Sequence, residues 1–180
     1  MIRHEARTCT IRLCTTLTDD RIRKLYRSYV SAGPAALEVR RKRGKSPRRT
    51  AYFLRNASAH LEASLLAGLF AAVGLIEDEG ARNPSQRSLE FGALFCDAFE
   101  TYQSLWHSGR LSFEHAWFLL MALASGEDLQ VDGCPECGGA FVRDALALSP
   151  GRCPICRMKT DTRGVRRLLA ERRKLADPRS

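Results

Sequence analysis

Apolar side chains recur at intervals of three and four residues along most of this 180-residue chain, which is the period of a helix that buries one face. Turn and capping residues divide the pattern into separate segments. Thr18-Asp19-Asp20 begins one of them, because a threonine and two carboxylates suit the free N–H groups and the dipole of a helix N-terminus. We therefore predict four main helices, over residues 18–30, 50–79, 86–107 and 112–125.

The apolar content of these segments predicts where the core lies. The second half of 50–79 is apolar nearly all round, so it belongs in the middle of the fold. Residues 1–17 fit a short strand and a frayed helix equally well, and that choice stays open. Within 86–107, five large side chains are expected to point inward: Leu89, Leu94, Phe95, Phe99 and Tyr102. The predicted fold class is mainly α.

The helical period ends near residue 127, and a cysteine-bearing segment follows. We place a domain boundary there, with a helical domain over 1–127 and a small ribbon-like module with a basic tail over 128–180. Within the module, Phe141-Val142-Arg143 is expected to form one strand, and 147–152 is expected to be its return strand. A basic terminal helix is expected over 162–176.

Four cysteines of the module are spaced like the ligands of a zinc ribbon. Cys134 and Cys137 form one C-x-x-C pair, and Cys153 and Cys156 form a second pair after fifteen intervening residues. Each C-x-x-C turn places two sulfurs on one side of a tight knuckle, where backbone N–H groups can donate to thiolates. Two facing knuckles make a tetrahedron, so we predict one Zn²⁺ held by these four side chains.

Disulfides and redox-active C-x-x-C motifs are the alternatives to zinc. Residues 1–13 carry charges throughout and lack the apolar run of a signal peptide, and the apolar stretch 61–76 is too short and too interrupted to cross a bilayer. We therefore expect a cytoplasmic protein without membrane contact, in which thiols stay reduced and metal binding is favoured over disulfides. Four protein ligands leave no position for an activated water, so the zinc would be structural.

Charge is segregated along the chain. Residues 1–55 hold 15 basic and 4 acidic side chains, 56–133 hold 3 and 11, and 134–180 hold 11 and 5. Two basic ends that flank an acidic middle favour binding to a polyanion, and the predominance of arginine suits contacts to phosphate or guanine. The candidate DNA-binding residues come from two basic runs: Arg40, Arg41, Lys42, Arg43, Lys45, Arg48, Arg49, Arg163, Arg166, Arg167, Arg172, Arg173 and Lys174.

The remaining reactive side chains suggest no catalytic site. Cys9, Cys14 and Cys96 lack partners at metal spacing and are expected to be ordinary core or half-buried side chains. The histidines of the helical segments stand alone in the sequence. The chain also lacks a glycine-rich phosphate loop, a serine nucleophile elbow and a paired-carboxylate motif. We therefore predict that the protein is not an enzyme.

Several segments of the chain match segments of one known protein family in their order and spacing. LTDDRIRKLY, at 17–26, resembles the start of that family's recognition-like helix, and NASAHLEASLLAGLF, at 56–70, resembles its next helix. HAWFLLMALASGEDLQVDGC, at 115–134, resembles the helix that leads into the family's zinc site. CGGAFV and CPIC, followed by a basic tail, also match. The chain thus resembles the flagellar transcriptional activator FlhC family, and the resemblance covers most of the chain from Leu17 to about Lys174.

The resemblance implies a mostly helical DNA-binding subunit that works with a partner, FlhD, in a heterohexamer-type complex. That complex binds double-stranded promoter DNA, recruits RNA polymerase and activates flagellar and motility genes. The family's zinc ligands correspond to Cys134, Cys137, Cys153 and Cys156, and 1–127 would hold DNA-binding and subunit-interface surfaces. A zinc-ribbon RNA- or ribosome-associated protein, a scaffolding subunit without a nucleic-acid role, and a diverged paralogue that regulates non-flagellar genes stay open as alternatives.

Overall fold

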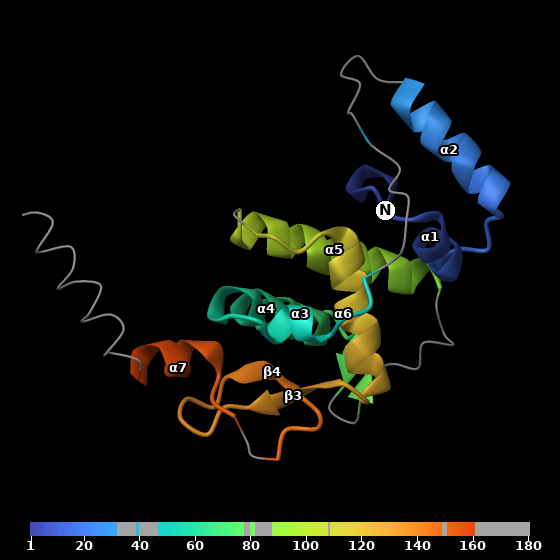
Figure 1. Ribbon diagram of the computed structural model, residues 1–180. Helices are drawn as coiled ribbons and strands as arrows, with labels where there is room; N and C mark the ends of the chain where they lie inside the picture. The colour runs from blue at the N-terminus through green and yellow to red at the C-terminus, as the bar shows by residue number, and fades with distance from the viewer. Residues whose placement is uncertain are drawn as a thin grey trace, which may run out of the picture.

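The computed structural model describes residues 1–31, 39, 47–77, 80–81, 88–107, 109–148 and 151–160. Within these ranges the protein is mainly helical, which confirms the predicted fold class. Figure 1 shows the helices gathered on one side of a small two-stranded sheet, with the C-terminal helix α7 beside that sheet. The predicted basic helix over 162–176 lies outside the described residues.

The N-terminal segment is helical, which settles the choice left open by its sequence. A short 3₁₀ helix, η1 (Ile2–His4), precedes α1 (Thr8–Cys14), and α2 (Asp19–Ser31) follows, close to the predicted bounds. Ile22 and Tyr26 of α2 are buried, and the Tyr26 hydroxyl donates a hydrogen bond to the carbonyl of Ala6. These contacts hold α2 against the turn between η1 and α1.

The single helix predicted over 50–79 is wrong, because the chain breaks it twice. It forms α3 (Ala51–Leu54) and α4 (Ala57–Ala72), followed by a hairpin of β1 (Ile76–Glu77) and β2 (Gly80–Ala81). Asn56 makes the first break. Its backbone is extended, with φ −156° and ψ 168°, and its side chain accepts a hydrogen bond from the Ala59 N–H. The asparagine therefore starts a new helix by capping it.

The next two helices match the prediction closely. Helix α5 (Leu89–Leu105) begins at Ser88, whose hydroxyl accepts from the third backbone N–H of the helix. Helix α6 (Phe113–Ser125) begins in the same way at Ser112 and ends at Gly126, which has a left-handed φ of 66°. Side-chain caps at the start and a glycine at the end are the signals that sequence reasoning can read.

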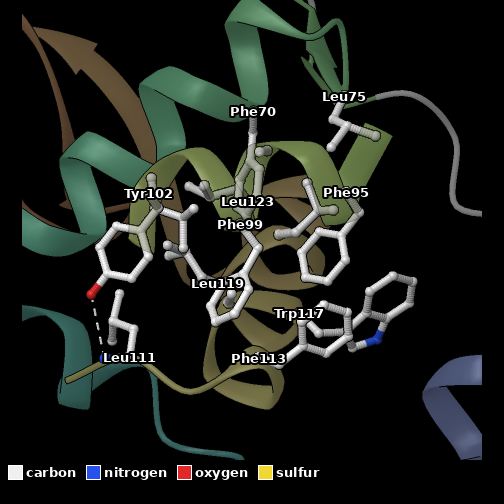
Figure 2. Packing of buried hydrophobic residues seen from close by; sticks show 14 of the residues in the cluster. Phe70, Leu75, Phe95, Phe99, Tyr102, Leu111, Phe113, Trp117, Leu119 and Leu123 are labelled. Atoms are coloured by element: carbon white, nitrogen blue, oxygen red, sulfur yellow. Dashed lines mark hydrogen bonds between the residues drawn. The ribbon is translucent and has the colours of Figure 1, made fainter. Parts of the chain in front are cut away.

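Aromatic side chains of α4, α5 and α6 form the centre of the core (Figure 2). The Phe95 ring lies 4.8 Å from that of Phe113 and 5.1 Å from that of Trp117, both edge-to-face. Phe95, Phe99 and Tyr102 are buried as predicted. Leu89 is not, because it is the first residue of α5 and 73% of its surface is exposed. The period identifies a face of the helix, but not how far along the helix the core extends.

Two buried glutamates tie loops to this core, and sequence reasoning gave neither of them a role. Glu62 of α4 accepts hydrogen bonds from the Tyr102 hydroxyl at 2.7 Å and from the backbone N–H of Arg110 at 2.8 Å. Burial and the Glu62 carboxylate raise the pKa of Tyr102, so the phenol stays a donor. Glu114 likewise accepts from the backbone N–H of Arg7 at 2.7 Å. Each carboxylate therefore fixes the position of a loop.

The small sheet corrects the predicted strand pairing. Strand β4 (Ala140–Asp144) contains the predicted strand, but its antiparallel partner is β3 (Leu129–Gly133), with Val131 opposite Val142. The expected return strand at 147–152 does not form in its described part. The first cysteine knuckle is itself the hairpin loop, so the strand before it pairs with the strand after it. Helix α7 (Pro154–Thr160) follows.

The sheet packs onto the helices. Leu129 and Val142 belong to the same buried cluster as the helical core. The domain boundary that the sequence suggested between residues 127 and 128 stays a prediction. Within the described ranges, no helix is both long enough and apolar enough to span a membrane.

The first prediction tests the core. Replacing Phe95 by alanine removes a fully buried ring and leaves a cavity, so we expect a loss of about 3–5 kcal/mol in the free energy of unfolding. The matched control on the same helix is Leu89→Ala, which we expect to change that free energy by no more than about 0.5 kcal/mol. Urea denaturation of both variants provides the measurement. Equal losses would contradict the described packing of α5.

Candidate metal centre

The first cysteine knuckle closes the hairpin between β3 and β4. The backbone N–H of Cys134 donates to the carbonyl of Gly139 at 3.0 Å, and the N–H of Gly138 donates to the carbonyl of Cys134 at 2.8 Å. Gly138 has φ +69°, a conformation that favours glycine. A Cβ at Gly139 would lie 3.4 Å from the sulfur of Cys137, which is a tight contact. The two glycines therefore allow the turn and make room for the sulfur.

The second knuckle lies at the start of α7. Cys153 directly precedes the helix and Cys156 lies in its first turn. The backbone N–H of Cys156 lies 3.4 Å from the sulfur of Cys153, and the N–H of Cys153 lies 3.4 Å from the sulfur of Cys134. Backbone donors of the second knuckle thus face sulfurs of both knuckles, as expected for groups that stabilise thiolates.

The four predicted ligands come together in space. The sulfur atoms of Cys134, Cys137, Cys153 and Cys156 all lie within 4.8 Å of one another, and those of Cys137 and Cys153 are 3.7 Å apart. Four sulfurs at about 2.3 Å from a tetrahedral ion would lie about 3.8 Å apart, whereas a disulfide requires about 2.05 Å. All seven cysteines are free thiols. The cluster can hold one metal ion, and the disulfide alternative finds no support.

Burial and charge make a cation favourable at this cluster. Cys134, Cys153 and Cys156 are at most 5% exposed, and they surround the ring of Phe141 in a small apolar cluster of their own. The backbone N–H of Cys153 lowers the pKa of Cys134 to about 6, whereas burial raises the pKa of Cys156. Buried thiolates in such close contact repel one another, and a bound cation removes that repulsion.

One ion pair connects the two knuckles at their surface. The guanidinium Nε of Arg152, just before Cys153, lies 3.0 Å from a carboxylate oxygen of Glu136, which is between the first two cysteines. Arg152 therefore pairs with a carboxylate beside the cluster. The pair is half exposed, so it orients the knuckles more than it stabilises them.

Helix α4 covers the free edge of β4 and so holds the metal centre against the core. Strand β3 pairs with one edge of β4, and the backbone N–H and carbonyl of Val142 lie on the opposite edge. The Val142 carbonyl lies 2.5 Å from Nε2 of His60, and its N–H donates to the hydroxyl of Ser64 at 3.1 Å. His60 and Ser64 are four residues apart, on one face of α4. Both are buried.

Most of the predicted DNA-binding residues lie outside the part of the chain that the structure describes. Arg48 and Arg49 are exposed and lie immediately before α3. The other members of the two basic runs, 40–45 and 163–174, lie outside the described residues. The basic runs therefore remain a prediction from sequence.

A model of the flagellar transcriptional activator (FlhC) family matches residues 1–168. The chain belongs to this family. The matched range includes the four-cysteine cluster, the helical core and α7. A search of curated proteins finds no match to the chain. Membership in the FlhC family identifies a regulator of transcription that activates flagellar genes.

The second prediction concerns the buried imidazole that joins α4 to β4. Burial lowers the pKa of His60 below its ordinary value of 6.5, and the charge of Arg157 acts in the same direction, opposed by the hydrogen bond to Val142. The folded protein therefore binds the proton less readily than the unfolded chain. The neutral His60 ring therefore contributes fully to the free energy of unfolding above pH 6.5, and this contribution is lost as the pH falls below 6.5.

We expect the free energy of unfolding of the wild-type protein to fall between about pH 7 and pH 5, and His60→Gln to reduce that slope. Glutamine can still donate to the Val142 carbonyl but does not titrate. His107→Gln, which replaces an exposed histidine, is the control and should keep the wild-type slope. Denaturation curves across this pH range give the slopes. Identical slopes for His60→Gln and His107→Gln would disprove the assignment.

Proposed function

We propose that this FlhC-family chain is the DNA-binding subunit of a bacterial flagellar gene activator and carries one structural Zn²⁺. The observation that carries the proposal is the family match over residues 1–168, which spans both the helical body and the cysteine cluster. The proposal includes a cytoplasmic location, binding to promoter DNA and activation of flagellar and motility genes through RNA polymerase.

Zinc is the metal that suits this ligand set best. Four thiolates in two C-x-x-C knuckles are typical of closed, tetrahedral structural zinc sites. Oxygen-preferring ions such as Mg²⁺ and Ca²⁺ are disfavoured by sulfur ligands. A closed site contributes folding energy because the unfolded chain cannot hold the ion in the same way. We therefore propose that zinc holds the β3–β4 hairpin and the start of α7 together.

The basic segments supply the proposed contact to DNA. Arginine and lysine side chains neutralise backbone phosphates and release counterions, so binding should weaken steeply with salt. The candidate residues of the runs 40–49 and 163–174 would provide most of this affinity. A minority of them would reach base edges, and the sequence-dependent bending of the duplex would add specificity. Arg48 and Arg49, exposed before α3, are compatible with that role.

A second subunit completes the proposed complex. Residues 56–133 carry 3 basic and 11 acidic side chains, so the middle of the chain is unsuited to contact DNA directly. We propose that this acidic and apolar part contacts an FlhD-like partner in a heterohexamer-type assembly. The basic ends would then remain available for DNA on the outside of the complex.

The third prediction tests the metal and the function together. We expect the purified, reduced protein to contain one zinc ion per chain, and Cys134→Ser to lose it. We also expect that variant to lose promoter binding, because the basic tail follows the second knuckle directly. Cys9→Ser, which changes an exposed cysteine outside the cluster, is the matched control and should retain both properties. Elemental analysis and sequencing of genomic DNA that co-purifies with the tagged protein provide the two measurements.

The same experiment separates the alternatives. Enrichment upstream of flagellar genes supports the proposal, whereas enrichment at other promoters identifies a paralogue with different targets. Competition by structured RNA that exceeds competition by duplex DNA would point to an RNA-binding protein. A Cys134→Ser variant that keeps its fold and its promoter binding without metal would refute the proposed role of zinc.

A further inference from the structure

Four exposed arginines surround the corner where α3 meets α4. Arg48 and Arg49 precede α3, Arg55 lies between the two helices, and Arg110 lies in the loop before α6. Helix α3 packs against α4, and Tyr52 and Phe53 of α3 lie against rings of α6, so these segments are neighbours (Figure 1). Arg55 and Arg110 line one shallow hollow, whose other lining residues are Tyr52, Asn56, Ser58, Ala59, Glu62 and Leu111. We call the four side chains the corner arginines.

Several other arginines of the described chain have acidic partners, whereas the corner arginines have none among the described residues. Arg12, Arg23, Arg143 and Arg152 each form an ion pair with an aspartate or glutamate. None of the corner arginines forms an ion pair with a carboxylate of the described residues. Within the described part of the chain, their charges are therefore left to an external anion.

Neighbouring contacts hold the Arg55 side chain and the Arg49 backbone in place. The guanidinium carbon of Arg55 lies 4.2 Å from the centre of the Tyr52 ring, and that ring stacks on His115 at 4.5 Å. A guanidinium over an aromatic face is attracted to it and keeps its edges free to donate. The backbone N–H of Tyr52 also donates to the carbonyl of Arg49, which fixes Arg49 relative to this stack.

The backbone of Arg110 is fixed by the buried carboxylate of Glu62. That carboxylate is the acidic group among the lining residues, but it accepts from the Tyr102 hydroxyl, the Arg110 N–H and the Ser58 hydroxyl. It is 2% exposed, so it faces the protein rather than the solvent. The outer surface of the corner is therefore positive, and the Arg55 guanidinium and the backbones of Arg49 and Arg110 are positioned before any ligand binds. Such preorganisation lowers the entropic cost of binding.

We propose that the corner arginines contact successive phosphates of duplex DNA. This inference rests on the proposed DNA-binding function and adds Arg55 and Arg110 to its contact surface. Arginine matches phosphate in geometry, and four exposed arginines around one corner suit a ligand with regularly repeated anionic groups better than a single anion. The corner also includes Arg48 and Arg49, the last two members of the first basic run in the sequence.

The fourth prediction uses the salt dependence of binding. The full chain, purified alone and with the subunit that co-purifies with it, is titrated into a fluorescent duplex about three helical turns long. Affinity is measured from about 50 mM to about 200 mM salt. The Arg55→Gln/Arg110→Gln variant should lower the slope of log affinity against log salt by about 1.8, because each lost phosphate contact removes about 0.9. Its affinity should fall by roughly one to two orders of magnitude at low salt.

The control is Arg3→Gln/Arg12→Gln, which removes the same charge from exposed positions of η1 and α1. It should leave the slope close to that of the wild type. Thermal unfolding and metal content are measured for both variants, and both should match the wild type. If the wild type binds duplex but the corner variant keeps its slope, this inference is wrong and the proposed function stands. If the wild type fails to bind duplex at any salt, alone or with its partner, both are wrong.

Discussion

The convergence of four sulfur atoms is the constraint on which the C-terminal part of the structure depends. The β3–β4 hairpin has two five-residue strands and α7 has seven residues, so neither is long enough to be stable alone in water. The first knuckle is the hairpin loop, and the second begins the helix. Closing both knuckles around one cation would therefore join a strand pair and a helix that share few other contacts. The apolar ring of Phe141 lies among the cysteines and excludes water from this junction.

Helix α4 connects that junction to the rest of the molecule. Its buried face contributes to the aromatic core, and His60 and Ser64 bind the free edge of β4 at Val142. Its first turn follows the capping residue Asn56, which lies next to Arg55 and the exposed corner. Glu62 of the same helix fixes the loop that carries Arg110. One helix thus positions the metal centre on one side and the corner arginines on another, which gives the two proposed functional surfaces a fixed relation.

What the sequence predicted correctly rests on short-range features, although not every short-range feature was interpreted correctly, as the pairing of β3 with β4 shows. The helices and the four-cysteine cluster depend on caps, periods and spacings within about twenty residues, which a single sequence displays. The break at Asn56 was missed because the apolar period continues through it, and one capping side chain decides the outcome. Leu89 shares the period of the buried residues but lies beyond the end of the core. The partner of His60 is 82 residues away, so no local pattern reveals it.

The most direct test of this account is X-ray absorption at the zinc edge of the purified, reduced protein. We predict one zinc ion per chain, with four sulfur ligands at about 2.3 Å and no nitrogen or oxygen in the inner shell. A shell that includes oxygen or nitrogen would contradict the closed structural site, since it would leave a cysteine unbound and a position open to solvent. A protein that folds fully without zinc would contradict the account at its base.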